Sequence, residues 1–248
     1  MLPYLASTHY QLLGITFQTW GTFVAAGFLV GAWIAMRRAK TKGLDPKRVA
    51  DLAFWIFLAA MLGSRIFHVL FYDPAYYITN PLAALDPRQP GFAIFGGFLG
   101  AALASWIYIR KYSLDFIRYA DVLIWGLPLG CGIGRIGCFL IHDHPGTLSN
   151  SLLAIKYPDG QSRHDLGLYL SLIGFATAGL SLWLNRRERH PGFWLGVYMC
   201  IEALSRIALD FLRVADARYF ALTPTQWLSI PLFAAGAWLI VNKKQKQN

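Results

Sequence analysis

An arginine and a group of histidine and aspartate side chains stand at the end of an otherwise apolar, glycine-rich segment. Residues 134–146 read Gly-Arg-Ile-Gly-Cys-Phe-Leu-Ile-His-Asp-His-Pro-Gly, with the arginine at position 135. A guanidinium at membrane depth is costly unless it meets a buried partner or an anionic ligand, so Arg135 marks a candidate functional site. An arginine at the hydrocarbon edge, with ionisable groups just outside it, suits the phosphate of a phospholipid.

A second set of charges lies in a later apolar segment. Glu202, Arg206 and Asp210 stand four residues apart and so line one face of a helix, with Arg213 three residues further on. At membrane depth such charges must face the protein interior or water. One interpretation is a self-neutralising ladder that only joins neighbouring helices. The other is that Arg206 and Arg135 face each other across a lipid-accessible cavity and hold one phosphate, because guanidinium binds phosphate bidentately.

His142, Asp143 and His144 are the next candidates for chemistry. A His-x-His pair without an identifiable third and fourth ligand is a weak metal signal, so we expect no metal and no other cofactor. A solvated loop is one interpretation. The other is catalytic, with an imidazole as general base near neutral pH and a carboxylate that orients it. His164 and Asp165 supply a second such pair in the same loop.

Arg65 is a third guanidinium inside an apolar segment, and His68 follows three residues later. A structural pair with Asp51 or Asp121 is one possibility. Because Arg65 lies near the middle of its segment, we favour a connection to the polar core that contains Arg135.

The elements that must position these side chains are long apolar segments. The 248 residues are 56% hydrophobic and 15% charged, with a mean hydropathy of +0.41, whereas about a quarter of the residues in a soluble domain are charged. A membrane-spanning helix needs roughly 17–25 mostly apolar residues. We predict seven, over residues 13–36, 50–71, 93–109, 119–141, 166–184, 192–212 and 223–242. The sequence therefore predicts an all-α integral membrane protein with one membrane-embedded domain, residues 1–248.

Basic residues are distributed unevenly between the two ends of these segments. Of the 23 Lys and Arg residues, 15 follow predicted spans one, three, five and seven, 5 fall on the other side and 3 lie inside spans. The positive-inside rule then places the C-terminus in the cytoplasm and the N-terminus outside. The net charge of +10 thus reflects topology and anionic lipid headgroups, and not nucleic acid. No basic region or cleavage site accompanies the first apolar run, so we expect a retained helix.

Two predicted spans carry glycines at helix-packing spacing. In lipid, small residues let helix backbones approach closely. Tight packing is one interpretation, and space for a lipid headgroup beside Arg135 is the other; both can hold at once. The glycines are Gly96, Gly97 and Gly100 in the third span, and Gly126, Gly130, Gly134 and Gly137 in the fourth.

With these residues in hand, the chain resembles the prolipoprotein diacylglyceryl transferase family nearly end to end. The resemblance implies seven spans with the N-terminus outside, in the bacterial inner membrane. It also implies transfer of the diacylglyceryl group of phosphatidylglycerol to the lipobox cysteine of prolipoprotein signal peptides, with release of glycerol phosphate. The matching stretches are Gly63-Ser-Arg-Ile-Phe-His-Val-Leu-Phe-Tyr72, Gly96-Gly97 with Phe98-Leu-Gly100, Gly134-Arg-Ile-Gly-Cys-Phe139, Arg163-His164 with Leu168-Tyr169, Arg206 through Arg213 with Asp216, and Gln226 followed by Leu-Ser-Ile-Pro231.

The resemblance also implies roles by position. Arg135 matches the arginine that binds phosphatidylglycerol, and Arg206 and Asp210 match the family's essential arginine and its acidic partner. A thiolate would attack the glycerol carbon while charge builds on the departing phosphate, and fixed guanidinium groups would stabilise that charge. We place further residues with the substrate-binding group: Arg65, Gly96, Gly97, Gly134, Gly137 and His164.

Several positions depart from the family pattern. Phe95 replaces the histidine of the usual His-Gly-Gly, Trp20 and Glu202 replace tyrosines, and the usual Gly-Arg-x-Gly-Asn-Phe-x-Asn-Gly-Glu is altered in four places. The arginines expected to bind the phosphate are therefore kept, whereas the histidine that could act as the family's base is replaced by Phe95. We predict that His142 or His144, oriented by Asp143, accepts the thiol proton. The four altered places are Cys138, Ile141, His142 and Asp143.

Two other classes of function remain open at this point. A non-catalytic or redirected paralogue that binds phosphatidylglycerol is favoured by the loss of the histidine at position 95, and opposed by the retention of Arg135, Arg206 and Asp210. A transporter would need broken helices in inverted halves, for which only Pro128 gives a hint.

Overall fold

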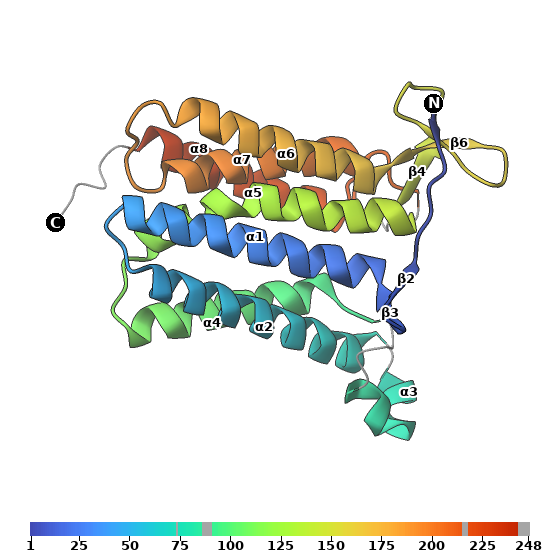
Figure 1. Cartoon of the computed structure of the whole chain (residues 1–248), viewed down its shortest axis with the longest axis horizontal. Helices are drawn as coiled ribbons and strands as arrows, with labels where there is room; N and C mark the ends of the chain where they lie inside the picture. Colours follow the sequence, from blue (N-terminus) through green and yellow to red (C-terminus); the bar gives the residue numbers. More distant parts are fainter. Residues whose placement is uncertain (73, 86–90, 215–217, 243–248) are drawn as a thin grey trace.

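Seven long helices lie side by side in the computed structural model, which describes residues 1–72, 74–85, 91–214 and 218–242 (Figure 1). Each coincides with one of the predicted apolar segments. The helices are α1 (Thr19–Thr41), α2 (Pro46–Phe71), α4 (Ile94–Lys111), α5 (Phe116–Ile141), α6 (Leu166–Leu184), α7 (Phe193–Asp210) and α8 (Pro224–Val241).

Five of these helices, α1, α2, α5, α6 and α8, are long and apolar enough to cross a membrane. The 18 residues of α4 end in Arg110 and Lys111, and the 18 residues of α7 include Glu202, Arg206 and Asp210. The charged residues at the end of α4 and within α7 therefore explain why these two helices are less apolar than the other five. The five apolar helices place the chain among multi-pass membrane proteins.

The first apolar segment begins its helix later than the sequence predicts. Residues 13–18 belong to a hairpin of β2 (His9–Leu12) and β3 (Ile15–Gln18), and α1 starts at Thr19. Leu13 and Gly14 join the strands with φ values of 51° and 79°, and two positive φ angles in a row are typical of a tight hairpin turn. The apolar residues of β3 therefore belong to the hairpin, and the prediction that the first span begins at residue 13 is wrong by six residues.

A small sheet covers the ends of α5 and α6 and was not predicted. Its strand order is β1-β5-β6-β4, with β1 parallel to β5 and the other pairs antiparallel. Strands of two to four residues in polar loops leave no periodic pattern to read. The strands are β1 (Leu2–Pro3), β4 (Pro145–Leu148), β5 (Ile155–Lys156) and β6 (Ser162–Asp165), and the short helices α3 (Pro74–Thr79) and η1 (Pro81–Leu85) follow α2.

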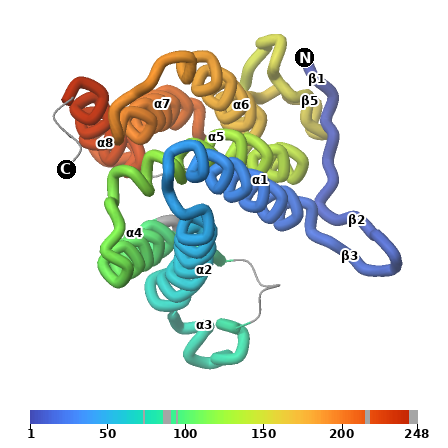
Figure 2. The backbone as a smooth tube through the Cα atoms, turned by 60° about the vertical axis from the view of Figure 1, so that its left-hand side comes forward, coloured from blue at the N-terminus to red at the C-terminus, as the bar shows by residue number. Residues whose placement is uncertain are grey.

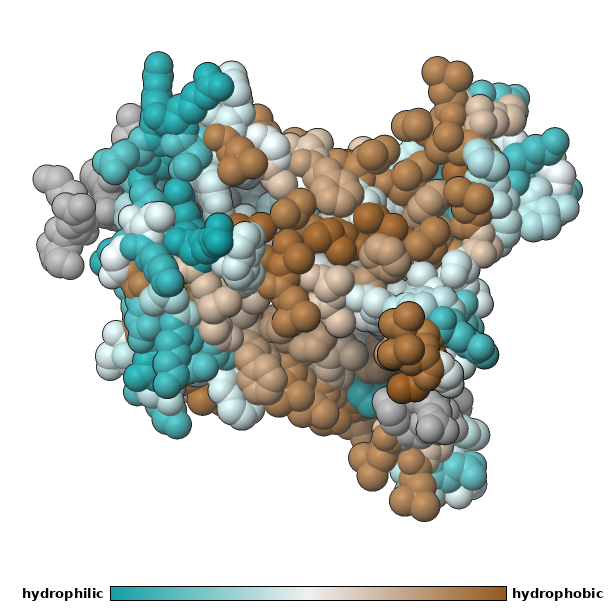
Figure 3. Space-filling view, viewed as in Figure 1, coloured by the Kyte–Doolittle hydropathy of each residue, from teal (hydrophilic) through white to brown (hydrophobic). Residues whose placement is uncertain are grey.

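The two ends of the bundle differ in character. The strands and α3 lie at one end, at the right of Figure 1, and the connection from α1 to α2 lies at the other end. Figure 3 shows hydrophilic surface at both ends of this view and a largely hydrophobic surface between them. The loop end that carries the strands is also the end where α5 finishes, so Asp143 and His144 lie there.

Glycines bring neighbouring helices into close contact, as the packing interpretation predicts. A Cβ on Gly126 would collide with the carbonyl oxygen of Gly31, so α5 and α1 touch along their backbones. Gly63 and Gly96 make the same kind of contact between α2 and α4. Figure 2 shows the resulting order, with α1 and α5 at the centre, α2 and α4 on one side, and α6, α7 and α8 on the other.

Candidate functional site

A cavity of about 60 Å³ lies between α5, α6 and α7 and is lined by both Arg135 and Arg206. Arg135 precedes the end of α5 by six residues and Arg206 precedes the end of α7 by four, or about 9 Å and 6 Å along the two axes. The two arginines therefore lie in the half of the bundle that carries the strands, and the cavity extends from them to the middle of α5 at Pro128. The rest of its lining is Pro128, Cys131, Leu170, Ile173, Gly174, Thr177, Tyr198, Ile201 and Glu202.

Arg206 pairs with Glu202, its neighbour one turn earlier in α7. Arg206 Nε donates to Glu202 Oε1 over 2.8 Å, and the two side chains are 17% and 29% exposed. Asp210, expected as the acidic partner of Arg206, instead lies 3.5 Å from Arg213 Nε and accepts a 2.8 Å hydrogen bond from the hydroxyl of Thr223. The expected ladder is therefore divided into two ion pairs, and only Glu202–Arg206 faces the cavity.

Arg135 has a different environment. Its Nη1 lies 3.8 Å from Cys138 Sγ. In the part of the chain that the structure describes, no carboxylate lies within ion-pair distance of this guanidinium. Two arginines and one glutamate thus give the cavity a net positive charge. A positive site in a membrane-embedded bundle favours an anionic ligand.

Three polar residues of the cavity were missed by the sequence argument: Tyr198, Thr177 and Cys131. The hydroxyl of Tyr198 lies 3.9 Å from Cys131 Sγ and so links α7 to α5. Tyr198 stands four residues before Glu202, so extending the charged face of α7 by one turn would have identified it. Cys131 and Thr177 stand among apolar residues and carry no comparable signal.

His142 is buried, and the carboxylate that orients its ring is Asp165 and not Asp143 as predicted. It ends α5 with a left-handed backbone, φ 49°. Its Nδ1 lies 2.7 Å from Asp165 Oδ2, its Nε2 lies 3.2 Å from the Leu5 carbonyl oxygen, and its ring stacks on Tyr4. Both ring nitrogens therefore face oxygens of the protein, and the ring is not part of the cavity lining.

Asp165 joins this buried pair to the start of α6. It caps α6 by accepting the Leu168 backbone N–H over 3.0 Å, and it also accepts the hydroxyl of Tyr157 over 3.1 Å. Burial, together with the negative charge of Asp165, raises the pKa of Tyr157, so that hydroxyl stays protonated and keeps donating. The turn between α5 and α6 is therefore held by one carboxylate with several donors.

Replacing His142 with alanine is expected to destabilise the protein. The change removes one donor from buried Asp165 but leaves Tyr157 and the Leu168 N–H, so we expect a loss of about 2–3 kcal/mol. The apparent melting temperature in detergent should fall by about 4–10 °C. The matched control is His9→Ala in the exposed β2, which should change it little. Equal melting temperatures for both variants would contradict the structural role of His142.

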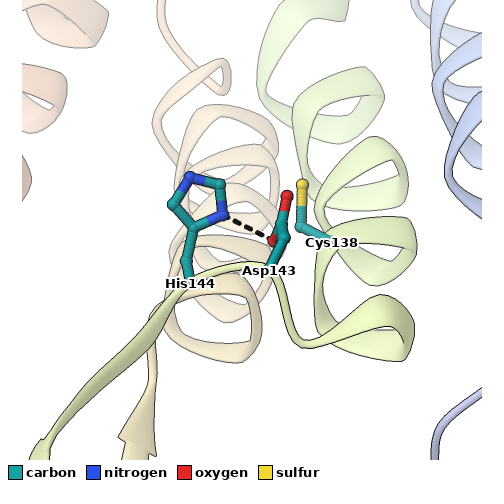
Figure 4. Close-up of side chains that lie close together, drawn as sticks. All are labelled: Cys138, Asp143 and His144. Atoms are coloured by element: carbon teal, nitrogen blue, oxygen red, sulfur yellow. Dashed lines mark ion pairs between the residues drawn. The ribbon is translucent and has the colours of Figure 1, made fainter. Parts of the chain in front are cut away.

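Asp143 and His144 lie just beyond α5 and pair with each other. His144 Nδ1 is 2.5 Å from Asp143 Oδ1, and both side chains are about one-third exposed. Figure 4 shows the pair beside Cys138, whose sulfur lies at the end of α5. The His144 carbonyl oxygen accepts the Leu166 N–H, which fixes this segment to α6. Of the predicted group of His142, Asp143 and His144, the last two therefore lie near Arg135, with Cys138 between.

The remaining predicted substrate-binding residues lie away from the cavity. Arg65 donates to the carbonyl oxygens of Ala83, Ala84 and Gly91 at 2.8–3.0 Å, so it contacts η1 and the segment before α4 and does not line the cavity that contains Arg135. His164 Nδ1 pairs with the Tyr169 hydroxyl at 2.6 Å, since Asp165 is taken by His142. The glycines face neighbouring helices: Gly96 and Gly97 face α2, and Gly134 and Gly137 face α1.

Known proteins share this sequence pattern over most of the chain. Residues 8–242 match the family model described as LGT, prolipoprotein diacylglyceryl transferase. Three relatives carry the name phosphatidylglycerol–prolipoprotein diacylglyceryl transferase. The relative from Nitratidesulfovibrio vulgaris Miyazaki F is 32% identical over 93% of this chain and 91% of its own length. The relative from Chromohalobacter salexigens is 31% identical over 90% and 86%, and that from Pseudomonas aeruginosa is 33% identical over 85% and 84%.

The match covers both arginine-bearing helices of the cavity as well as the loop that follows α5. It therefore includes every residue that lines the cavity. The family resemblance found in the sequence motifs is confirmed by the family model and by these relatives. The chain belongs to the prolipoprotein diacylglyceryl transferase family.

Proposed function

We propose that this protein transfers the diacylglyceryl group of phosphatidylglycerol to the cysteine thiol of a prolipoprotein. The observation that carries the proposal is the meeting of Arg135 and Arg206, from two different helices, at one cavity. Membership of the family supports the same reaction. A cavity of about 60 Å³ has room for a few waters, or for one phosphate group. The acyl chains would lie in the surrounding lipid.

In this reaction the site must stabilise the negative charge on the departing phosphate. The thiolate of the prolipoprotein attacks the glycerol carbon of the diacylglyceryl group, a carbon–sulfur bond forms, and the bond to the phosphate oxygen breaks. Glycerol phosphate leaves with the electron pair on that oxygen. Arg135 and Arg206 hold the phosphate throughout, and each preorganised donor of this kind contributes about 100- to 1,000-fold to the rate in enzymes.

The finer topology belongs to the same proposal. All seven long helices cross the bilayer, with the N-terminus outside and the C-terminus in the cytoplasm of a bacterial inner membrane. The end of the bundle near α5's last turn, where the strands lie, then faces outward. Basic residues that follow α1, α4 and α6 support this direction under the positive-inside rule. The cavity thus draws its phosphatidylglycerol from the outer leaflet, and the signal peptide presents its lipobox cysteine there.

Removal of the thiol proton is assigned to Asp143 and His144. They lie beside Cys138, which touches Arg135, and they are accessible to solvent where His142 is not. Phe95, at the position of the family's usual histidine, is exposed on α4 and is not part of the cavity lining. The loop after α5 therefore supplies solvent-accessible ionisable groups beside the cavity.

The proposed function is tested by complementation of a bacterial strain depleted of its own transferase. The full-length protein should restore growth, and a reporter prolipoprotein should gain the diacylglyceryl group, measured as a mass increase of its signal-peptide cysteine. A purified assay with phosphatidylglycerol vesicles and a lipobox peptide should release glycerol phosphate. Normal membrane expression without lipidation in either assay would favour a lipid-binding paralogue and contradict the proposal.

A further inference from the structure

Cys138, Asp143 and His144 bring three different metal-binding groups to one point at the end of α5. A thiol sulfur, a carboxylate oxygen and an imidazole nitrogen all lie within 4.8 Å of one another. In Figure 4 the sulfur projects from the last turns of α5, and the carboxylate and imidazole from the following segment lie beside it. Thiolate, carboxylate and imidazole are the three ligand types that proteins use for zinc.

We infer that these three residues bind a zinc ion and leave its fourth position open. The role of the ion rests on the proposed function: the open position takes the thiol of the incoming prolipoprotein cysteine as a thiolate. Three protein ligands with one open position are the arrangement of catalytic zinc sites, whereas structural sites use four. The inference therefore concerns a reactive site and not a structural staple.

His144 Nδ1 is the atom that most directly points to a ligand. It is buried and, among the described residues, it has no hydrogen-bond partner of acceptable geometry, although Asp143 Oδ1 lies only 2.5 Å away. Nothing fits between two atoms this close, so a group that engages both must lie beside them, with the two side chains turned apart. A shared metal ion supplies that group, since both atoms are metal ligands.

The backbone around the cluster is already fixed. His142 ends α5 and is held by Asp165, and the His144 carbonyl oxygen accepts the Leu166 N–H over 3.2 Å. Ligand atoms of a tetrahedral zinc site are about 3.3–3.6 Å apart, because the bonds to zinc are about 2.0–2.3 Å long. Side-chain rotation over roughly 1 Å would close the widest spacing, up to 4.8 Å, and would open the 2.5 Å between His144 Nδ1 and Asp143 Oδ1 to that range. No change in the path of the chain is needed to bring the three atoms to a common centre.

Charge and position connect the cluster to the arginine cavity. Thiolate and carboxylate together carry two negative charges, which balance a divalent ion, so a metal adds no net positive charge beside Arg135. Arg135 Nη1 lies 3.8 Å from Cys138 Sγ and also lines the cavity. A thiolate held on the metal therefore lies next to the proposed phosphate site. Nucleophile and leaving group would then both lie close to Arg135, with the glycerol carbon between them.

The step balances without any further reactant. On binding, the incoming thiol gives its proton to water, because a thiol that coordinates zinc is deprotonated at neutral pH. The sulfur then supplies the electron pair for the new bond to the glycerol carbon, and the bond between that carbon and the phosphate oxygen breaks. Zinc stays at the same oxidation state throughout. Asp143 and His144 thus promote the loss of the thiol proton as ligands of the ion, and the proton itself goes to water.

The binding claim is tested on the purified full-length protein in detergent, freed of metal with a chelator. Titration with zinc against a chromogenic competitor should give one ion per chain. Cobalt in place of zinc should give the charge-transfer absorption of a thiolate ligand. The absence of stoichiometric zinc, or of the cobalt–thiolate band in the wild-type protein, would overturn the inference whatever any variant does.

Variants then assign the ligands. Cys138→Ser should abolish the cobalt–thiolate band, and His144→Ala should weaken zinc binding by more than about 100-fold. The matched controls are Cys200→Ser, a second free cysteine, and His9→Ala, an exposed histidine; both should bind zinc as the wild type does. Melting temperatures of the metal-free proteins check that each variant is folded. A band that survives Cys138→Ser, or is lost in Cys200→Ser, would contradict the assignment.

The role of the ion is separated from the proposed function by assaying transfer with and without zinc. Full activity in the metal-free protein would overturn the thiolate role and leave the transferase standing. No activity in a zinc-loaded protein that passes the titration would overturn the transferase and leave the metal site standing. The expected result is transfer that falls with chelation and returns with added zinc.

Discussion

Arg135→Gln is expected to lower the rate of diacylglyceryl transfer by about 100- to 1,000-fold, because it removes a fixed donor to the departing phosphate. The guanidinium lines the cavity and, among the described residues, has no carboxylate partner that its loss would leave uncompensated. Folding should therefore survive the change. The measurement is the initial rate of glycerol phosphate release from phosphatidylglycerol vesicles, with protein amounts matched by expression in the membrane.

Two companion variants make the Arg135 result specific. Arg135→Lys keeps the positive charge but loses the planar pair of donors, so the rate should fall by only about 10-fold. Arg118→Gln removes an exposed arginine from the first turn of the same helix, where it contacts the Lys42 carbonyl oxygen. That control should keep its activity. Equal losses in Arg118→Gln and Arg135→Gln would show a general effect on α5 and contradict the phosphate role.

Arg206→Gln should also cost about 100- to 1,000-fold in rate, for the same electrostatic reason. Unlike Arg135, however, Arg206 is paired with a carboxylate, Glu202, at 2.8 Å. Removing the arginine leaves a partly buried carboxylate without its partner, and this alone can lower stability. A loss of activity in the single variant would therefore fit either a phosphate role or a damaged fold.

The double variant Arg206→Gln, Glu202→Gln separates these two causes. It removes both charges and lets the two amides hydrogen-bond, so the melting temperature should return towards that of the wild type. The transfer rate should stay low, since the phosphate still lacks one guanidinium. Recovery of activity along with stability would mean that Glu202–Arg206 only joins helices, which is the ladder interpretation of this face of α7.

The helices could be predicted from the sequence because a helix that crosses a lipid bilayer needs a long apolar segment. All seven predicted segments coincide with helices, and the glycine spacing correctly indicated close helix packing. The start of α1 was misplaced, since Ile15 and Phe17 are as hydrophobic in a hairpin as in a helix. The four-stranded sheet could not be predicted from the sequence, because its strands are too short to show alternating hydrophobic and polar residues.

The two arginines of the cavity could also be predicted, because a guanidinium within an apolar helix is costly unless it faces a polar cavity or a charged partner. The histidine pairing was not. Asp143 adjoins His142 in the chain, but the left-handed turn at His142 directs its ring to Asp165, 23 residues away. Arg65 binds backbone carbonyl oxygens, which no side-chain pattern can indicate. At His142 and Arg65 the path of the backbone therefore decides the partner, and this path could not be predicted from neighbouring residues in the chain.

The most direct measurement is a structure of the full-length protein with phosphatidylglycerol bound, by electron microscopy in a lipid nanodisc. We predict that the lipid phosphate lies in the cavity between α5, α6 and α7, within hydrogen-bond distance of both Arg135 and Arg206. A phosphate that rests elsewhere, or touches one guanidinium while the other remains closed off by protein groups, would contradict the account.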